Sequence, residues 1–110
     1  MYVENVKSQM RKGMLEYCIM LLLCDKPYYT SDIIEKLEKA NLIVVEGTLY
    51  PLLSRLRKEG LLDYEWQESP CGPPRKYYKL TDSGKKVLSA LNENWKLLAG
   101  TVEKIRNIEK

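Results

Sequence analysis

One short segment rich in proline and glycine, residues 69–74 (SPCGPP), most limits what this chain can fold into. It has the composition of a turn, and it lies between two segments in which apolar and polar residues alternate. Leu62, Tyr64 and Trp66 alternate with polar residues before the turn, and residues 75–80 (RKYYKL) follow it. Alternation of this kind is typical of half-buried strands. The sequence therefore predicts one β-hairpin in a chain whose other apolar patterns have helical spacing.

Two helices are expected in the first part of the chain. Residues 8–24 have apolar side chains at intervals of three and four, which is the spacing of one face of a helix. Pro27 ends this helix, because proline disfavours the helical conformation in the residue before it. A second helix is expected over residues 31–40, with Thr30 or Ser31 as its N-cap. The buried face of the first helix is expected to consist of Met10, Met14, Tyr17, Cys18, Leu21 and Leu22.

Two further helices flank the hairpin. The third is expected over residues 46–59, ending at Gly60. Pro51 has no amide hydrogen to donate, so we expect either a later start or a distorted first turn. The fourth helix is long, with Thr81 or Asp82 as its N-cap, and ends close to the last residues of the chain, near Ile108.

Three helices followed by a hairpin is the order of elements in a winged helix-turn-helix. The predicted fold class is mostly α with a small β-hairpin, and the long last helix is an addition to the winged unit. We expect the DNA-binding unit over residues 1–80 and a dimerisation helix over residues 81–110. The dimerisation helix is expected to pack with the N-terminal helix, so that the whole chain forms one compact unit.

The polar face of the third helix is suited to contact with DNA. Opposite the stripe of Leu49, Leu52, Leu53 and Leu56, the early positions are small or carry hydroxyls, and the later positions are basic. A recognition helix places its first residues against base edges and its cations against phosphates. An ordinary solvated amphipathic helix would have the same pattern. The candidate DNA contacts on this helix are Gly47, Thr48, Tyr50, Pro51, Ser54, Arg55 and Lys58.

The predicted hairpin is basic and aromatic. Residues 69–81 contain three cations and no acid. If Tyr78 and Leu80 point to the core, alternation places the remaining side chains on the outer face and Lys76 near the tip. The outer-face residues are then Arg75, Tyr77 and Lys79. A projecting hairpin of this composition could grip a DNA backbone, although lysines also protect ordinary edge strands from aggregation. The candidate DNA contacts on the hairpin are Arg75, Lys76, Tyr77 and Lys79.

Three motifs resemble the PadR family of bacterial transcriptional regulators. Residues 46–53 (EGTLYPLL), followed by residues 59–61 (EGL), resemble the recognition helix of that family. Residues 72–81 (GPPRKYYKLT) resemble its wing and the entry to its last helix. Residues 11–13 (RKG) and the apolar run after them resemble its first helix. The resemblance covers nearly the whole chain.

This resemblance implies a winged helix-turn-helix that dimerises through its C-terminal helix, binds double-stranded DNA and usually represses promoters. The single C-terminal helix resembles short-form members, several of which bind flat hydrophobic drugs or aromatic effectors at the dimer interface. Two positions depart from the family pattern: residues 29–31 (YTS) replace a frequent Tyr-Gly-Tyr, and Val45 replaces a polar cap of the recognition helix. The DNA contacts that the resemblance implies are Thr48, Tyr50, Ser54, Arg55, Lys76 and Tyr77.

The last helix has a narrow apolar stripe with heptad spacing. Such a seam would be exposed on a monomer this small, so we expect it to meet a second copy. A twofold homodimer would present two recognition helices to half-sites of a roughly palindromic operator, about 34 Å apart. The predicted interface residues are Leu88, Leu91, Trp95, Leu98, Val102 and Ile105.

Trp95 lies in the middle of this seam. In a twofold dimer, two such indoles could stack on a planar aromatic ligand, although Trp95 could equally be a packing residue. The hypothetical effector pocket consists of Trp95, Leu91, Leu98, Met10 and Met14.

Several functions are disfavoured by what the sequence lacks. Without histidine, the chain lacks the commonest general base and metal ligand, and it has no glycine-rich phosphate loop or nucleophile motif. We therefore expect no enzyme activity, cofactor or metal. The remaining alternative is a winged-helix adaptor that binds a protein and not DNA. An adaptor would have no need for the basic hairpin.

No membrane partner is expected. The longest apolar run, residues 17–24, is well short of the roughly 20 residues that cross a bilayer, and the first residues lack the apolar core of a signal peptide. These features favour the cytoplasm, as do three irregularly spaced cysteines. Cys18 and Cys24 are expected to be buried and inert, which leaves Cys71 as the one candidate for a redox sensor.

Overall fold

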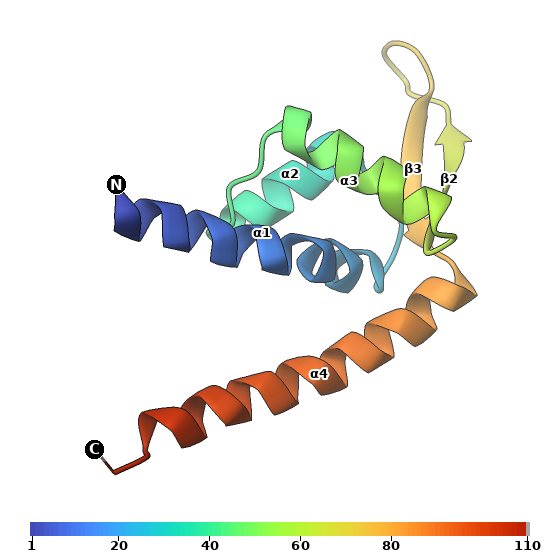
Figure 1. The fold of residues 1–110 in the computed structure, drawn as a ribbon. Coiled ribbons are helices and arrows are strands. Elements are labelled where there is room, and N and C mark those ends of the chain that lie inside the picture. Colours follow the sequence, from blue (N-terminus) through green and yellow to red (C-terminus); the bar gives the residue numbers. More distant parts are fainter. Residues whose placement is uncertain (110) are drawn as a thin grey trace.

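The computed structural model describes residues 1–109 and consists mainly of helices. The elements are α1 (Tyr2–Leu23), β1 (Tyr28–Tyr29), α2 (Thr30–Lys39), α3 (Glu46–Lys58), β2 (Leu62–Gln67), β3 (Arg75–Leu80) and α4 (Asp82–Arg106). In Figure 1, α1, α2 and α3 pack together, and the β2–β3 hairpin projects beyond α3. Helix α4 leaves the base of the hairpin and diverges from α1 towards its C-terminus (Figure 1). This is the predicted winged helix-turn-helix with one long additional helix.

The sheet has three antiparallel strands in the order β1-β3-β2. The hairpin strands have the predicted bounds, and Leu62 pairs with Leu80 at their base. The two-residue strand β1 was not predicted; its Tyr28 pairs with Tyr78. Two residues are too few to show alternation, although an aromatic pair directly after Pro27 favours an extended backbone.

The hydrophobic core lies between α1, α2, α3 and the base of the hairpin. Ile19, Ile33, Leu49 and Leu53 have no exposed surface, and Leu62 is 2% exposed. The predicted leucine stripe of α3 is confirmed, because it faces this core along its whole length. Burying one such side chain contributes roughly 1.5–3 kcal/mol.

Two predictions for α1 were wrong. The helix begins at Tyr2 and not near residue 8. Its buried face consists of Leu15, Ile19, Met20 and Leu23, whereas Met10 is 68% exposed. Every residue from 17 to 24 is apolar or aromatic, so the sequence there does not define which side of the helix faces the core.

The starts of α2 and α3 also differ from the predictions. Neither Thr30 nor Ser31 caps α2; Tyr29 precedes the helix without a side-chain bond, and Thr30 is its buried first residue. Helix α3 begins directly after Val45 and continues through Pro51. Pro51 cannot donate to the carbonyl of Gly47, four residues earlier. Because Pro51 and Gly47 are both exposed, water can hydrate that carbonyl and a later start is unnecessary.

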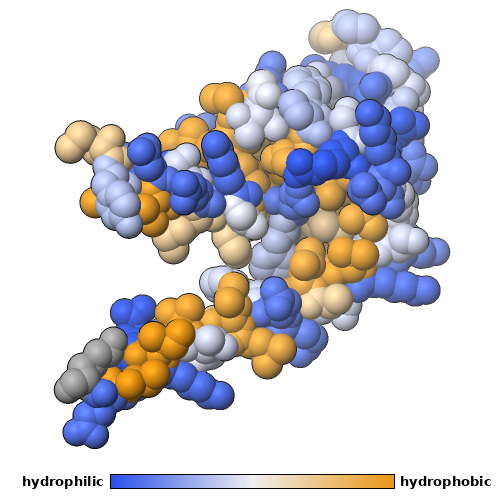
Figure 2. Space-filling model, viewed as in Figure 1, coloured by the Kyte–Doolittle hydropathy of each residue, from blue (hydrophilic) through white to orange (hydrophobic). Residues whose placement is uncertain are grey.

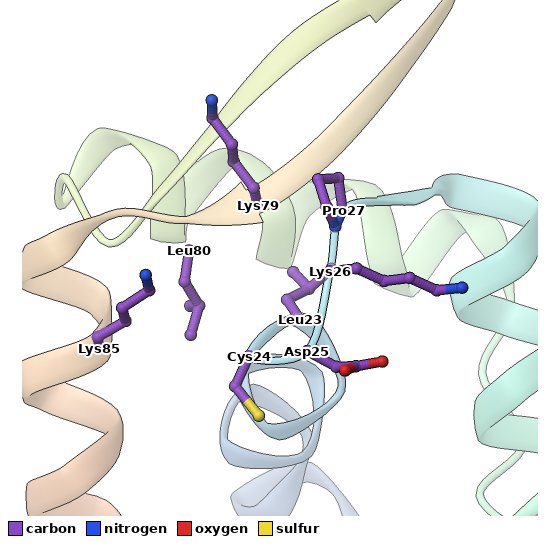
Figure 3. Close-up of a pocket in the computed structure, with 8 residues that line it drawn as sticks. All are labelled: Leu23, Cys24, Asp25, Lys26, Pro27, Lys79, Leu80 and Lys85. Carbon is purple, nitrogen blue, oxygen red and sulfur yellow. The ribbon is translucent and has the colours of Figure 1, made fainter.

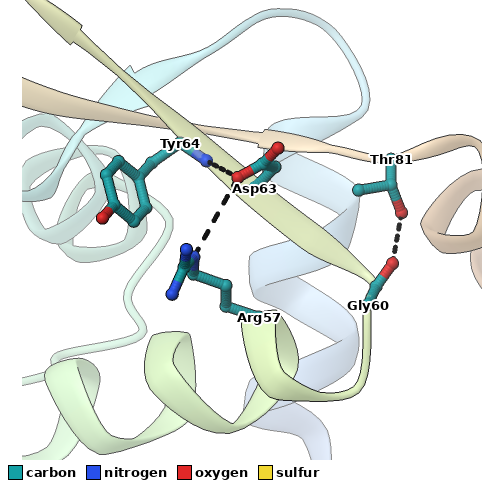
Figure 4. A network of polar contacts seen from close by, with 5 residues as sticks. All are labelled: Arg57, Gly60, Asp63, Tyr64 and Thr81. Atoms are coloured by element: carbon teal, nitrogen blue, oxygen red, sulfur yellow. Dashed lines mark hydrogen bonds and ion pairs between the residues drawn. The ribbon is translucent and has the colours of Figure 1, made fainter.

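The start of α4 is attached to the end of α3. As predicted, Thr81 is the N-cap: its hydroxyl accepts a hydrogen bond from the Gly84 amide (3.0 Å). The same hydroxyl donates to the carbonyl of Gly60 (2.6 Å), as Figure 4 shows, and the Thr81 amide donates to the carbonyl of Leu61 (3.1 Å). Gly60 has a φ of 77°, in the left-handed region that favours glycine, and it ends α3 as predicted. We name this group of contacts the Gly60–Thr81 joint.

Helix α4 contacts the core only through its first turns. Leu88 is 6% exposed and belongs to the core, and Leu91 is packed against it. The Tyr17 hydroxyl donates to the Asn92 side-chain oxygen (2.6 Å), which ties α1 to α4. No helix within residues 1–109 has both the length and the apolar character that a bilayer crossing requires.

Candidate nucleic-acid interface

The exposed face of α3 carries all the predicted contact residues of that helix. These residues face away from the leucine stripe, and each of them is exposed: Gly47, Thr48, Tyr50, Pro51, Ser54, Arg55 and Lys58. The face changes from small and hydroxyl-bearing residues near the N-terminus of α3 to basic residues near its C-terminus, as predicted. The structure therefore offers hydrogen-bond donors and positive charge on one continuous surface.

The hairpin has two chemically different faces. Because side chains alternate along a strand, the paired residues Trp66–Lys76 and Tyr64–Tyr78 share the face that Leu62 and Leu80 occupy. The other face carries Arg75, Tyr77 and Lys79, as predicted, together with acids of β2. Arg75, at the first position of β3, also lines the groove between the hairpin and α3. Lys76 thus lies on the aromatic face of the hairpin, beside Trp66, and the alternation from Tyr78 could have revealed this.

Arg57 ties the hairpin to α3. Its guanidinium lies 4.6 Å from the centre of the Tyr64 ring, and its Nε lies 4.0 Å from the carboxylate of Asp63 (Figure 4). Cation–π and ionic attraction therefore act between the last turn of α3 and the start of β2. These contacts join the end of α3 to the start of the hairpin.

A groove of about 350 Å³ separates α3 from the hairpin. It is lined by Tyr29, Thr30, Tyr50, Ser54, Trp66, Pro74, Arg75, Lys76 and Tyr78. No carboxylate is among these lining residues in the described chain. We call this space the wing groove. It brings together four of the predicted DNA contacts, two from α3 and two from β3.

The cations of the wing groove lie over aromatic rings. Lys76 Nζ is 4.5 Å from the centre of the Tyr64 ring and 5.4 Å from that of Trp66. The guanidinium of Arg75 is 4.7 Å from the centre of the Tyr29 ring. Such contacts hold a cation in place without neutralising it, so its full charge remains available to an anion.

The phenol of Tyr78 forms part of the same groove. Burial raises its pKa, the neighbouring Tyr50 and Tyr64 add to the rise, and the positive charge of Arg57 opposes it. A phenol is protonated at neutral pH even at its ordinary pKa, so Tyr78 can donate a hydrogen bond there, and the rise leaves this unchanged.

Two of the predicted DNA-binding cations have carboxylate partners. Arg55 forms an ion pair with Glu16 of α1, and Lys79 Nζ lies 3.6 Å from Glu65 of β2. Glu65 lies on β2, outside residues 69–81, and its carboxylate is next to Lys79 in the folded hairpin. The hairpin is therefore not free of acid around Lys79. Both pairs are solvent-exposed, so each contributes little to stability and can open when a phosphate competes.

Five residues of the wing groove were not among the predicted DNA contacts: Tyr29, Thr30, Trp66, Pro74 and Tyr78. Tyr29 and Thr30 belong to the short strand and helix start that were not predicted. Trp66 was expected to alternate towards the core, yet it is 60% exposed, because the hairpin extends beyond the body of the protein. An exposed tryptophan opposite a lysine near the end of a hairpin is the signal that could have identified it.

A second cavity, of about 570 Å³ and mainly apolar, lies between α1 and α4. Met10, Met14, Trp95 and Leu98 line it, together with Gln9, Gly13, Ala99, Val102 and Glu103. Leu91 lines a smaller adjoining cavity with Met14, Trp95 and Leu98. The five residues of the hypothetical effector pocket are thus brought together. Figure 2 shows apolar side chains along α4 and on the side of α1 that faces it.

The cysteines differ from the prediction at one position. Burial raises the pKa of the Cys18 thiol, which makes it a weaker nucleophile, as expected of an inert cysteine. Cys24 was expected to be buried but is exposed, and it lines a hollow of about 200 Å³ with Leu80 and Lys85 (Figure 3). It follows the last turn of α1, where the chain leaves the core. Cys71 is exposed in the hairpin turn.

A helix-turn-helix with a basic exposed face beside a basic, aromatic hairpin defines the winged-helix class of DNA-binding proteins. The chain belongs to the transcriptional regulator PadR-like family, whose model matches residues 19–90. An uncharacterised protein of Lysinibacillus sphaericus is 30% identical over 93 residues, which cover 82% of this chain and 85% of that protein.

Solved structures of the same family agree with this assignment. A PadR-like transcription factor from Bacteroides fragilis is 67% identical, with a TM-score of 0.79 over 92% of this chain and 98% of that one. A PadR-like regulator from Bacillus cereus is 37% identical, with a TM-score of 0.82 over 92% and 99%. A PadR family regulator from Eggerthella lenta is 33% identical, with a TM-score of 0.85 over 98% and 95%. The protein is accordingly a DNA-binding transcriptional regulator and not an enzyme.

Proposed function

We propose that this protein is a homodimeric repressor that recognises a roughly palindromic operator in double-stranded DNA. The observation that carries the proposal is the surface formed by the exposed face of α3 and the wing groove. That surface combines donors suited to base edges with cations suited to phosphates. The proposed contacts are Gly47, Thr48, Tyr50, Pro51, Ser54, Arg55, Lys58, Arg75, Lys76, Tyr77 and Lys79.

The shape of the chain supports a dimer. Its radius of gyration is 16.4 Å, against about 13 Å for a compact domain of this length. The excess comes from α4, in which Trp95, Leu98, Val102 and Ile105 are between 44% and 53% exposed. Pairing two α4 helices, each against the α1 of the other copy, would cover these side chains. Leu88 is removed from the predicted interface, because it is already buried in the core of one chain.

Fluorescence anisotropy with two duplexes tests the proposed operator binding. One duplex is taken from the region upstream of the protein's own gene, and the other is unrelated. Preferential binding to the upstream duplex, weakening steeply with salt, is the expected result. Absence of binding to either duplex at low salt would contradict the proposal and favour the adaptor alternative. The repressor role predicts that the protein lowers run-off transcription from the upstream region.

Replacing Lys76 by alanine is expected to weaken binding to every duplex and to reduce its salt dependence. Each lost phosphate contact reduces the slope of log K against log salt by about 0.9, so the proposed dimer, which loses two, should show a reduction of about 1.8. Anisotropy titrations at four salt concentrations measure this slope. Lys104→Ala, which removes the same charge near the end of α4, is the control and should leave the slope unchanged. Equal slopes for the Lys76 variant and the unmodified protein would argue against a phosphate contact.

We further propose that a planar hydrophobic effector occupies the cavity between α1 and α4 and releases the protein from DNA. The cavity volume lies within the range of small-molecule sites, and the Trp95 ring supplies a stacking surface. Glu103 is a carboxylate of the lining, which favours a cationic ligand.

The chain has two tryptophans, so a Trp66→Phe variant retains only Trp95. Tryptophan emission from this variant therefore reports on the cavity between α1 and α4. Titration with ethidium in the absence of DNA is expected to quench Trp95 emission in a saturable manner. Leu98→Ala should weaken that quenching severalfold. An unchanged emission with ethidium and with a panel of other planar aromatic cations would show that Trp95 is a packing residue.

A further inference from the structure

The wing groove has a composition that suits one unit of a DNA backbone. Its walls carry two cations, Arg75 and Lys76, and the hydroxyls of Tyr50 and Ser54. The acids of β2, Asp63 and Glu65, pair in register with Lys79 and Tyr77, on the opposite face of the hairpin. Positive charge and donor groups therefore converge on the groove, and negative charge is directed away from it.

Trp66 gives this groove an apolar wall. Its ring meets the Tyr64 ring edge-on, with centres 6.0 Å apart and an interplanar angle of 88°. Lys76 lies over both rings, so the Trp66 indole contacts Tyr64 and Lys76. The Trp66 side chain is nevertheless 60% exposed. A large aromatic surface left open beside cations fits a ligand that is apolar at one end and anionic at the other.

We propose that the wing groove binds one deoxyribose-phosphate unit of the DNA backbone, with the sugar against Trp66 and the phosphate against Lys76 and Arg75. This inference rests on the proposed DNA binding. It assigns Trp66 the role of an apolar contact to the sugar. That contact is separate from those of the recognition helix and of the hairpin cations. Because sugar and phosphate are the same at every base pair, Trp66 contributes affinity and register and not base preference.

Fluorine NMR of the protein containing 5-fluorotryptophan tests the position of the ligand. The chain has two tryptophans, and the Trp66 resonance is the one missing from the Trp66→Phe variant. Adding the upstream duplex is expected to shift the Trp66 resonance, with the same midpoint as the anisotropy titration. Duplex binding without a change at Trp66 would overturn the groove inference and leave the proposed function standing. Failure of the duplex to bind at all would overturn both.

Substitution of single phosphates tests the chemistry of the ligand. In a series of duplexes, one backbone phosphate at a time is replaced by a neutral methylphosphonate. At one position in each half-site, the replacement is expected to weaken binding by the unmodified protein about tenfold. The same replacement should weaken binding by a Lys76→Met, Arg75→Met double variant less than about twofold, because both partner charges are already absent. A decrease of equal size in both proteins would overturn the assignment.

The role of Trp66 is tested by variants that leave the charge unchanged. Trp66→Ala is expected to weaken binding to the upstream and unrelated duplexes by the same factor, about tenfold, and Trp66→Phe should restore most of the affinity. Leu97→Ala, which removes an exposed apolar side chain of α4 outside the groove lining, is the control. Thermal melting checks that each variant folds. A Trp66→Ala protein that loses preference for the upstream duplex would show base reading and overturn the assignment.

Discussion

Replacing Gly84 by alanine is expected to destabilise the fold by about 3 kcal/mol, which lowers Tm by roughly 15 °C. A Cβ at this position would lie 2.1 Å from the carbonyl oxygen of Leu61 and 3.1 Å from a methyl carbon of Leu80. The closest neighbour is backbone and cannot rotate away as a side chain could. The Leu61 carbonyl also accepts the hydrogen bond from the Thr81 amide, so its displacement would strain the Gly60–Thr81 joint. Thermal melting followed by circular dichroism measures the effect.

Gly100 provides a matched control in the same helix. No atom lies within 4 Å of a Cβ built there, and the residue is exposed. Gly100→Ala should stabilise the protein by about 0.5–1 kcal/mol, because alanine loses less backbone freedom in a helix than glycine does. Two variants with the same Tm would mean that α4 does not start against Leu61 as described.

Replacing Leu98 by glutamate is expected to convert the dimer into a monomer and to weaken operator binding at least about 100-fold. Leu98 is 51% exposed in a single chain, so its replacement does not disturb the core. In the proposed dimer, the same position faces the second copy, and a buried carboxylate without a partner would prevent association. Loss of the second recognition helix removes the gain in affinity of about 10²–10⁴ that linked binding provides. Sedimentation equilibrium and anisotropy measure the two effects.

Leu97→Glu is the control for this experiment. Leu97 neighbours Leu98 in sequence, is 72% exposed and lies outside the heptad stripe. This variant should remain dimeric and bind the operator normally, although it carries the same added charge. If both variants were monomeric, the dimer interface would not follow the heptad stripe. If both variants remained dimeric, α4 would not form the dimer interface.

The predictions were most accurate for elements whose sequence pattern has only one structural interpretation. The leucines of α3 recur at helical spacing among polar residues, so the buried and exposed faces of α3 were both defined. Thr81 was one of two predicted caps for α4, and the structure shows it to be the cap. The two hairpin strands were delimited by the proline- and glycine-rich segment between them, which is typical of a turn.

The prediction was incomplete where contacts depend on residues distant in sequence. The pairing of Glu16 with Arg55 joins residues on α1 and α3, and nothing local to either helix indicates it. The wing groove depends on β1, which exists only because β3 is beside it. The face of α1 that meets the core was ambiguous, since an unbroken apolar run contains several equivalent faces. These are consequences of tertiary packing, which overrides local pattern.

The hydrogen bond between Tyr17 and Asn92 divides α4 into a part that is attached to the winged body and a part that extends beyond it. Before it, the helix is fixed to the winged body by the Gly60–Thr81 joint and by Leu88 and Leu91. After it, residues 93–106 extend for about 21 Å, at 1.5 Å per residue. A bend of about 10° at Asn92 would displace the far end of that segment by about 3.6 Å, close to the rise of one base pair. In the proposed dimer, the curvature of this segment therefore sets which operator spacing both recognition helices can reach together.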